Sequence, residues 1–146
     1  MHFTEYDTRL AAYAALVDDE QRILLTWWNG EGRGTPCWTM PGGGVEYEES
    51  MVEAVEREVL EETGYLVRVG SPISAHSFTA AGSGPGGRPY KSVRIVFSAT
   101  IVGGSLGTIE VGGSTDFAEW VPLDRIEGLE DKADIVDVAY AAVAAD

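Results

Sequence analysis

The segment from residue 50 to residue 63 most constrains how this chain can fold, because it has the period of a helix while its neighbours have the patterns of strands. Valines recur there at the i, i+3 and i+7 spacing of one helix face. Ser50 is a suitable N-cap with Glu53 three residues later, and Gly64 stands where a C-terminal cap belongs. We therefore expect one well-bounded helix at about residues 50–63.

The rest of the chain mixes apolar or β-branched segments, which predict strands, with glycine-rich segments, which predict loops. No internal repeat or linker is visible, so an α/β fold in a single domain, residues 1–146, is expected. The predicted strands are residues 10–17, 22–28, 65–73, 92–102 and 117–121, the second helix is 135–144, and the loops are 29–34, 80–89 and 103–113.

Acidic residues dominate the charge of the chain. Ten Lys and Arg residues stand against 24 Asp and Glu residues, which gives a net charge of −14. Such a surface repels phosphates and anionic lipids, so neither a nucleic-acid polymer nor a membrane is an expected partner. The single cysteine, Cys37, excludes an intramolecular disulfide and a cysteine-rich zinc site. Without a signal-like or membrane-spanning stretch, a cytoplasmic location is expected.

Three glutamates gather near the end of the predicted helix. Glu58, Glu61 and Glu62 stand at i, i+3 and i+4, on one side of a single turn, where like charges repel and the helix dipole is also negative. A divalent cation with oxygen ligands would supply the missing positive charge. The alternative is a solvated charged face, the usual role of acidic helix runs. Residues 43–65 carry a net charge of −7, half that of the chain.

The order of residues around this cluster resembles the signature of the Nudix hydrolase family, Gly-x5-Glu-x7-Arg-Glu-U-x-Glu-Glu-x-Gly-U, in which U is bulky and apolar. The match begins at Gly43 and ends at Tyr65, an aromatic residue where an aliphatic one is usual. The resemblance extends over about residues 10–126. It implies an α/β/α sandwich with a mixed β-sheet. It also implies Mg²⁺- or Mn²⁺-dependent attack of water on phosphorus in the pyrophosphate of a small nucleotide, such as a nucleoside triphosphate, ADP-ribose or a nucleotide sugar.

The resemblance also implies roles for residues of the signature. Glu58, Glu61 and Glu62 become metal ligands and catalytic residues, and Glu61 either ligates or acts on the attacking water. Gly43 offers its carbonyl to a metal or its amide to a phosphate, and a loop glycine that needs a positive φ is compatible with both roles. Gly44 beside it is a further substrate-binding candidate.

Two more residues of the signature are expected to support the site. Glu49 and Arg57 resemble the pair that holds the loop to the helix in this family, so a structural role is favoured over direct catalysis. Glu53 competes for Arg57, because it stands four residues before it on the helix.

An additional catalytic glutamate is common in the family about six residues before a tryptophan such as Trp120, but Ser114 occupies that position. The nearest upstream acid is Glu110, and Asp116 lies closer to the tryptophan. We assign the role to Glu110, because its glycine-rich loop could bring it to the cluster. A solvated loop acid is the alternative.

Substrate recognition depends on residues outside the signature. Arg88 is a candidate for pairing with a phosphate, and aromatic side chains could stack on a base, although aromatics at strand ends belong more often to the core. His76 is expected to be a hydrogen-bonded core residue. The aromatic candidates are Trp27, Trp28, Phe78 and Tyr90.

Two other functions compete with hydrolysis. A non-catalytic Nudix-like domain would bind a nucleotide as a sensor, but such a domain is expected to lose one of the three clustered glutamates. A merely acidic α/β protein would match the signature only by chance. A homodimer is a further expectation from the resemblance.

Overall fold

The computed structural model describes residues 1–82 and 85–145 of the chain. Its strands are β1 (Asp7–Ala15), β2 (Arg22–Trp28), β3 (Cys37–Thr39), β4 (Gly42–Gly44), β5 (Tyr65–Ala80), β6 (Tyr90–Gly104) and β7 (Thr115–Pro122). Its α-helices are α1 (Met51–Thr63) and α2 (Asp134–Ala144), and short 3-10 helices are η1 (Phe3–Glu5), η2 (Pro85–Gly87) and η3 (Leu123–Arg125). In the described residues no helix is long and apolar enough to cross a membrane.

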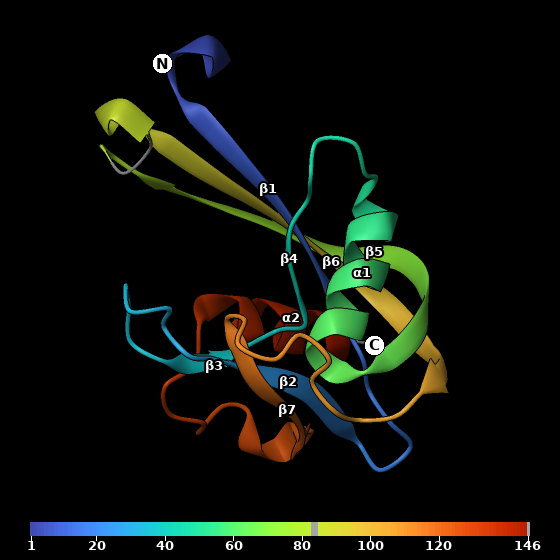
Figure 1. The fold of residues 1–146 in the computed structure, drawn as a ribbon. Coiled ribbons are helices and arrows are strands. Elements are labelled where there is room, and N and C mark those ends of the chain that lie inside the picture. Colours follow the sequence, from blue (N-terminus) through green and yellow to red (C-terminus); the bar gives the residue numbers. More distant parts are fainter. Residues whose placement is uncertain (83–84, 146) are drawn as a thin grey trace.

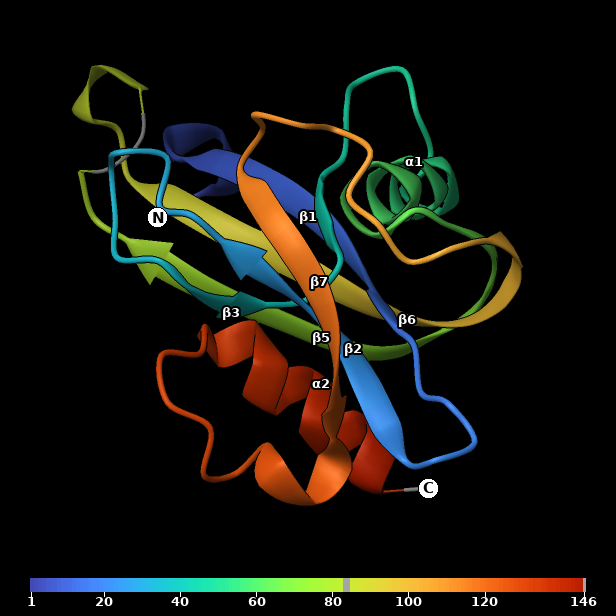
Figure 2. The same ribbon diagram turned by 60° about the horizontal axis from the view of Figure 1, so that its bottom comes forward.

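The strands form two sheets between the two α-helices (Figure 1). One sheet has the order β4-β1-β6-β5 and is mixed, because β1 runs parallel to β6 and antiparallel to β4. The other has the order β3-β2-β7 and is antiparallel. Helix α1 covers one side of this strand layer and α2 the other (Figure 2). The predicted α/β/α sandwich with a mixed β-sheet is confirmed.

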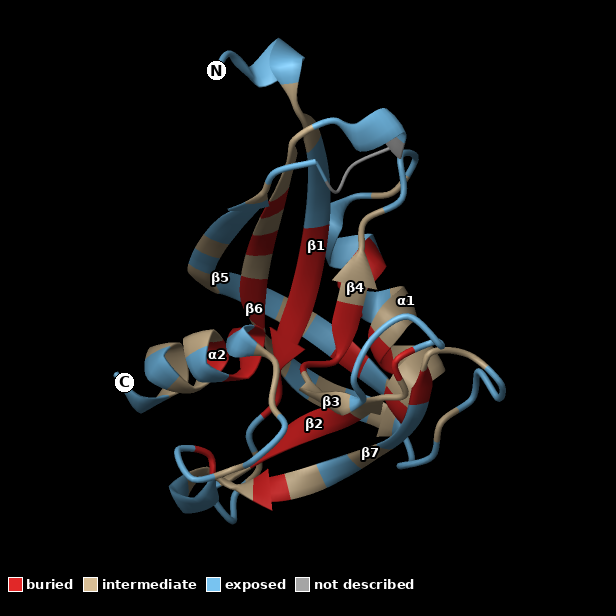
Figure 3. Ribbon diagram, turned by 90° about the vertical axis from the view of Figure 1, so that its left-hand side faces the viewer, coloured by how far each residue is buried: buried red, intermediate tan, exposed pale blue. Residues whose placement is uncertain are grey.

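Strand β1 explains how one apolar run supports two cores. Its odd-numbered residues from Ala11 to Ala15 pack in the core that includes α2. Ala12 and Ala14, with Leu16 just after the strand, pack in the core that includes α1. Side chains alternate between the faces of a strand, so a strand buried on both faces has a continuous apolar sequence. The buried residues accordingly concentrate in the middle of the strand layer (Figure 3).

Helix α1 begins and ends at its predicted caps. The Ser50 hydroxyl accepts a hydrogen bond from the Glu53 N–H, and the Glu53 carboxylate accepts one from the Ser50 N–H. Gly64 ends the helix in the left-handed conformation, with a φ of 83°. Val55 and Val59 are fully buried under the helix. The caps and the buried valines together set which side of the helix its glutamates occupy.

Strands β5 and β6 extend beyond the segments 65–73 and 92–102 that the sequence predicted, because their pairing continues to Ala80 and Tyr90. With the start of β1, their ends project from the body of the molecule (Figures 1 and 3). We call this projection, residues 3–10, 74–82 and 85–94, the arm. Residues 83 and 84 of the predicted loop 80–89 lie outside the described residues.

Candidate active site

Glu62 is the most buried glutamate of the acidic cluster. Its carboxylate accepts hydrogen bonds from the Gly42 N–H (2.8 Å) and from the Thr115 hydroxyl (2.8 Å), so it joins α1 to β4 and β7. Burial raises the pKa of Glu62 to about 8, although these two donors oppose the rise. The neighbouring Glu58 and Glu61 raise it further. This carboxyl is therefore poised to gain from any nearby positive charge.

Arg57 is the cation that contacts the cluster. Its Nη2 and Nε donate to the two carboxylate oxygens of Glu49 at 2.6 and 3.1 Å, and its Nη1 donates to Glu58 at 2.9 Å and to Glu61 at 3.4 Å. The hydrogen bonds from Arg57 hold the pKa of Glu49 below its usual range. Glu53 is occupied in the helix cap instead. The structure thus brings together the predicted pair of Glu49 and Arg57.

One guanidinium does not balance the carboxylates around it. Burial raises the pKa of both Glu58 and Glu61, and Arg57 lowers both. Glu110 adds to the rise, through its charge at Glu58 and through a hydrogen bond at Glu61. Because Glu62 lies beside them as well, carboxyl groups outnumber cations in the cluster.

Glu110 reaches the cluster because its loop caps the end of α1. Donors of residues 107–110 bond to the carbonyls of Glu61, Glu62 and Thr63 at 2.8–3.0 Å. The last carbonyls of a helix have no partner within the helix, so such a loop has a defined place to bind. As a result, Glu110 lines the same small recess as the three helix glutamates.

The two other residues considered for this role lie nearby. Ser114 also lines the recess. The carboxylate of Asp116 accepts a hydrogen bond from the Asn29 side chain at 3.0 Å, and Asp116 is not among the residues around the recess. Of the two acids, Glu110 is therefore the one that the structure brings to the cluster.

Two glycines of β4 are needed for different reasons. Gly42 has a φ of 141°, and a Cβ there would overlap the backbone of β1. Gly43 has no positive φ, so the prediction of a positive φ at Gly43 is wrong. A Cβ on Gly43 would instead lie 3.1–3.4 Å from the Glu58 carboxylate. The missing side chain at Gly43 therefore leaves space beside a glutamate of the cluster.

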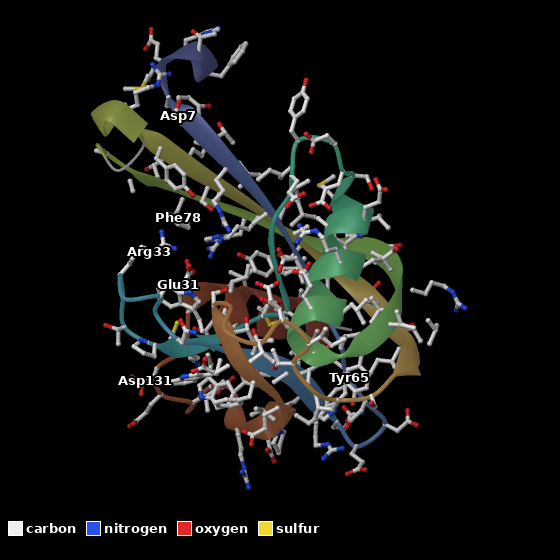
Figure 4. The ribbon with its side chains drawn as sticks, viewed as in Figure 1. Asp7, Glu31, Arg33, Tyr65, Phe78 and Asp131 are labelled. Atoms are coloured by element: carbon white, nitrogen blue, oxygen red, sulfur yellow. The ribbon has the colours of Figure 1, made fainter. Side chains whose placement is uncertain are left out.

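A cleft of about 560 Å³ leads from the acidic cluster to the arm. This volume is within the range of small-molecule sites. Figure 4 shows Glu31 and Arg33 on the loop that faces the arm, with Phe78 on the arm above them. The cleft is lined by Glu58, Glu62 and the glycines of β4 at one end, by Arg9, Tyr90 and Arg94 on the arm, and by Trp28, Glu31, Arg33 and Cys37 opposite.

The structure separates the predicted substrate-binding residues. Trp28 and Tyr90 line the cleft. Trp27 instead packs against two other aromatic rings. The distance between ring centroids is 5.2 Å to Trp38 and 6.1 Å to Phe117. These three rings lie in register on the three strands of the smaller sheet.

Arg88 lies away from the acidic cluster, within the arm. Its side chain donates to the Asp7 carboxylate at 2.9 Å and to the Thr4 carbonyl at 3.1 Å. These contacts join the segment before β6 to the start of β1, where Figure 4 labels Asp7. The structure therefore does not bring Arg88 together with the other predicted site residues.

A buried arginine on β6 was missed by the sequence analysis. Arg94 is 5% exposed, and its Nη1 and Nη2 each donate to the Asp134 carboxylate at 2.8 Å. Its Nη2 also contacts His76, and the ring of Phe78 lies 4.8 Å from its Cζ. The sequence did carry a signal for Arg94, a charged residue among the apolar residues of a predicted strand. Such a residue is buried only when it is paired, so a partner should have been sought. Thr115, which holds Glu62, has no comparable signal.

Comparison with known proteins identifies the family of the chain. The NUDIX domain family matches residues 7–141. The chain is 30% identical over 116 residues to the putative 8-oxo-dGTP diphosphatase of Bacillus subtilis, an alignment that covers 79% of this chain and 67% of that protein. It is 32% identical over 111 residues to the ADP-ribose pyrophosphatase of Methanocaldococcus jannaschii, covering 76% of this chain and 60% of the relative, less than two thirds of its length.

Solved structures have the same fold. A NUDIX hydrolase from Nitrosomonas europaea superposes with a TM-score of 0.78 at 25% identity, covering 95% of this chain and 90% of the other. The MutT protein from Methanosarcina mazei superposes with a TM-score of 0.74 at 25% identity, covering 97% of this chain and 96% of the other. The chain therefore belongs to the NUDIX family and is an enzyme of its diphosphohydrolase type.

Proposed function

We propose that this chain hydrolyses a pyrophosphate bond in a small nucleoside diphosphate derivative, with the help of a divalent metal ion. The observation that carries the proposal is the recess lined by Glu58, Glu61, Glu62 and Glu110. Of these four carboxyl groups, Glu58 and Glu61 contact the guanidinium of Arg57. The names of relatives include 8-oxo-dGTP, ADP-ribose and CTP. They support a nucleoside triphosphate or ADP-ribose as the substrate, and a nucleotide sugar is the third candidate.

The residues of the recess fit a hard divalent cation. Carboxylate oxygens are the ligands that Mg²⁺ and Mn²⁺ prefer, and a cation would oppose the burial and repulsion that raise the pKa values of Glu58, Glu61 and Glu62. In the part of the chain that the structure describes, no three acidic, histidine or cysteine side chains already converge in ligating geometry. A bound ion would therefore have to draw together the carboxylates of Glu58, Glu61 and Glu62, with the Gly43 carbonyl as a further ligand.

A bound metal would stabilise the negative charge of the phosphoryl oxygens and lower the pKa of the attacking water. Glu110 is our candidate for accepting the proton of that water, and Glu61 is the alternative. Glu49 and Arg57 would hold the helix side chains in place. Gly43 and Gly44 would let the substrate phosphates approach the backbone of β4, because they carry no side chain.

The proposal is tested by the products released from a panel of nucleotides with Mg²⁺, with Mn²⁺ and with EDTA. Nucleoside triphosphates, ADP-ribose, nucleotide sugars and dinucleoside polyphosphates make up the panel. We expect metal-dependent cleavage of at least one class. Binding of a nucleotide without any cleavage would contradict the proposal and favour a sensor.

The variant Glu62→Gln tests the assignment of the acidic cluster. It keeps the shape of the side chain but removes its charge, so cleavage should fall by more than about 100-fold. Glu56→Gln is the matched control, because Glu56 is an exposed glutamate of the same helix. Unchanged turnover in Glu62→Gln, with an intact circular dichroism spectrum, would remove Glu62 from the site.

A further inference from the structure

We infer that Arg9, on the arm, binds a second phosphate group of the substrate, on the opposite face of β4 from the acidic cluster. The inference rests on the proposed function, and it narrows the substrate to molecules in which two phosphates span this strand. It adds a specificity residue outside the signature segment, residues 43–65.

The pairing of the cleft arginines is the first observation behind this inference. Arg33 has its ion pair with Glu31 at 3.2 Å, and Arg94 has its carboxylate partner at 2.8 Å. Arg9 is exposed and has neither an ion pair nor a hydrogen bond within residues 1–82 and 85–145. In a chain with 24 acidic residues, the donors of this guanidinium remain available to a ligand.

The position of Arg9 beside the glycine strand is the second observation. A Cβ on Gly44 would lie 3.5–3.9 Å from the guanidinium of Arg9, whereas a Cβ on Gly43 would lie 3.1–3.4 Å from the carboxylate of Glu58. Successive residues of a strand face opposite sides, so the two opposite charges flank β4 on its two faces. Both faces open into the same cleft, because Arg9 and Glu58 line it together.

The place of β4 in the sheet lets one ligand reach both faces. Strand β4 lies at the edge of its sheet, with β1 on one side only. Because Gly43 and Gly44 carry no side chains, the Glu58 carboxylate and the Arg9 guanidinium lie directly against the two faces of this edge. A diphosphate that crosses the edge would place one phosphate at the acids and their metal. Its other phosphate would lie at the guanidinium of Arg9, which matches phosphate oxygens well.

The expected effect of losing this contact is on binding. A charge-assisted hydrogen bond at a partly solvated site supports a loss of affinity of about tenfold or more when the charge is removed. Arg9→Lys keeps the charge but not the paired donors, so it should retain part of the affinity. Arg68→Gln is the matched control, because Arg68 is an exposed arginine on β5 without a partner in the described residues.

The experiment measures binding of pyrophosphate, ADP and adenosine to the full chain with Mg²⁺ by titration calorimetry. Arg9→Gln should weaken the binding of pyrophosphate and of ADP about tenfold or more and leave the binding of adenosine unaffected. Arg68→Gln should change none of these affinities. Equal affinity of wild type and Arg9→Gln for pyrophosphate and ADP would overturn the inference. So would an equal loss for adenosine, or a wild type that binds neither phosphate compound.

Kinetics separate this inference from the proposed function. With the best substrate of the panel, Arg9→Gln should raise KM about tenfold and leave kcat within about threefold. An active enzyme whose KM is unaffected by Arg9→Gln contradicts only the inference. A chain that binds pyrophosphate through Arg9 but cleaves no nucleotide contradicts only the proposed function.

Discussion

The two ends of the cleft are assembled from the chain in different ways. The acidic end comes mainly from one continuous segment, residues 42–64, in which a glycine strand, a capped helix and its glutamates follow one another. The arm end comes from β1, β5 and β6, which are distant in sequence and meet only in the sheet. A local segment leaves a recognisable pattern of spacing, whereas a site made by strand pairing leaves none.

The arginines at the two ends of the cleft differ in their partners. Arg57 is held by three carboxylates, and we propose a positioning role for it, while Arg9 has no protein partner in the described residues. Changes at the acidic end should therefore act on kcat, and changes at the arm end on KM.

The largest effect is expected at Glu110. Glu110→Gln keeps the loop contacts, which are made by the backbone, but removes the carboxylate. If it accepts the proton of the attacking water, kcat should fall by about 100-fold or more with little change in KM. Steady-state kinetics with the best substrate of the panel measures both. A kcat within about threefold of wild type would assign the proton to Glu61 instead.

Arg57→Gln should reduce kcat by about 10- to 100-fold, because Glu49, Glu58 and Glu61 lose the group that orients them. KM should change little, in contrast to Arg9→Gln. Arg57→Lys should recover only part of the loss, because a lysine cannot donate the paired bonds to Glu49. A rise in KM larger than the fall in kcat would break the proposed division between the two ends.

The acidic end should also make stability depend on pH. The ordinary pKa of a glutamate is 4.5, and the fold raises the pKa of Glu62 to about 8. Between these two pH values the folded chain keeps a proton on Glu62 that the unfolded chain releases. The stability of the metal-free protein should therefore fall as pH rises through this window, by at most about 1.4 kcal/mol per pH unit. Urea unfolding in EDTA at pH 6 and 7 measures the difference.

Two controls identify the source of that pH dependence. Saturating Mg²⁺ should flatten it, because a cation stabilises the charged carboxylates. Glu62→Gln should reduce it without metal and leave the part that comes from the raised pKa values of Glu58 and Glu61. Groups with lowered pKa values, such as Glu49 and Asp134, lose their contribution in a separate window, as pH falls below about 4. An equal slope in wild type and Glu62→Gln would place the source at another group.

The smallest effect is expected from the helix cap. Ser50→Ala removes the side-chain half of the capping box and should lower the free energy of unfolding by about 1 kcal/mol, or the Tm by about 2–4 °C. Neither kcat nor KM should change, because the glutamates remain held at the other end of α1. Thermal unfolding and kinetics of the same sample test both statements. A lower kcat would show that the whole helix, and not its last turns, sets the geometry of the acids.

The sequence predicted the acidic end well, because helix spacing, caps and fixed intervals are local properties. The helix at residues 50–63, its two caps and the contact between Glu49 and Arg57 all follow from residues within one segment. Even the approach of Glu110 was expected, although its reason, the need of helix carbonyls for partners, became clear only in the structure.

The arm end could not be predicted in the same way. Arg9 and Arg94 reach the cleft because β1 pairs in parallel with β6, and no local pattern records that register. The placement of Arg88 within the arm depends on the same pairing, since Asp7 lies opposite Tyr90. The positive φ was placed at Gly43 instead of Gly42, because three consecutive glycines look alike in the sequence.

The attachment of the loop to the end of α1 has a consequence for how this site can diverge. The contacts are made largely by backbone atoms of residues 107–110, so side chains there can vary without releasing the loop. The length of this segment is constrained, because an insertion within residues 107–110 would shift Glu110 out of register with the helix end. An insertion after Val111 would leave these contacts in place and lengthen the loop between Glu110 and Gly113, which also lines the recess. Substrate range can therefore change by growth on one side of Glu110 while the chemistry on the other side is preserved.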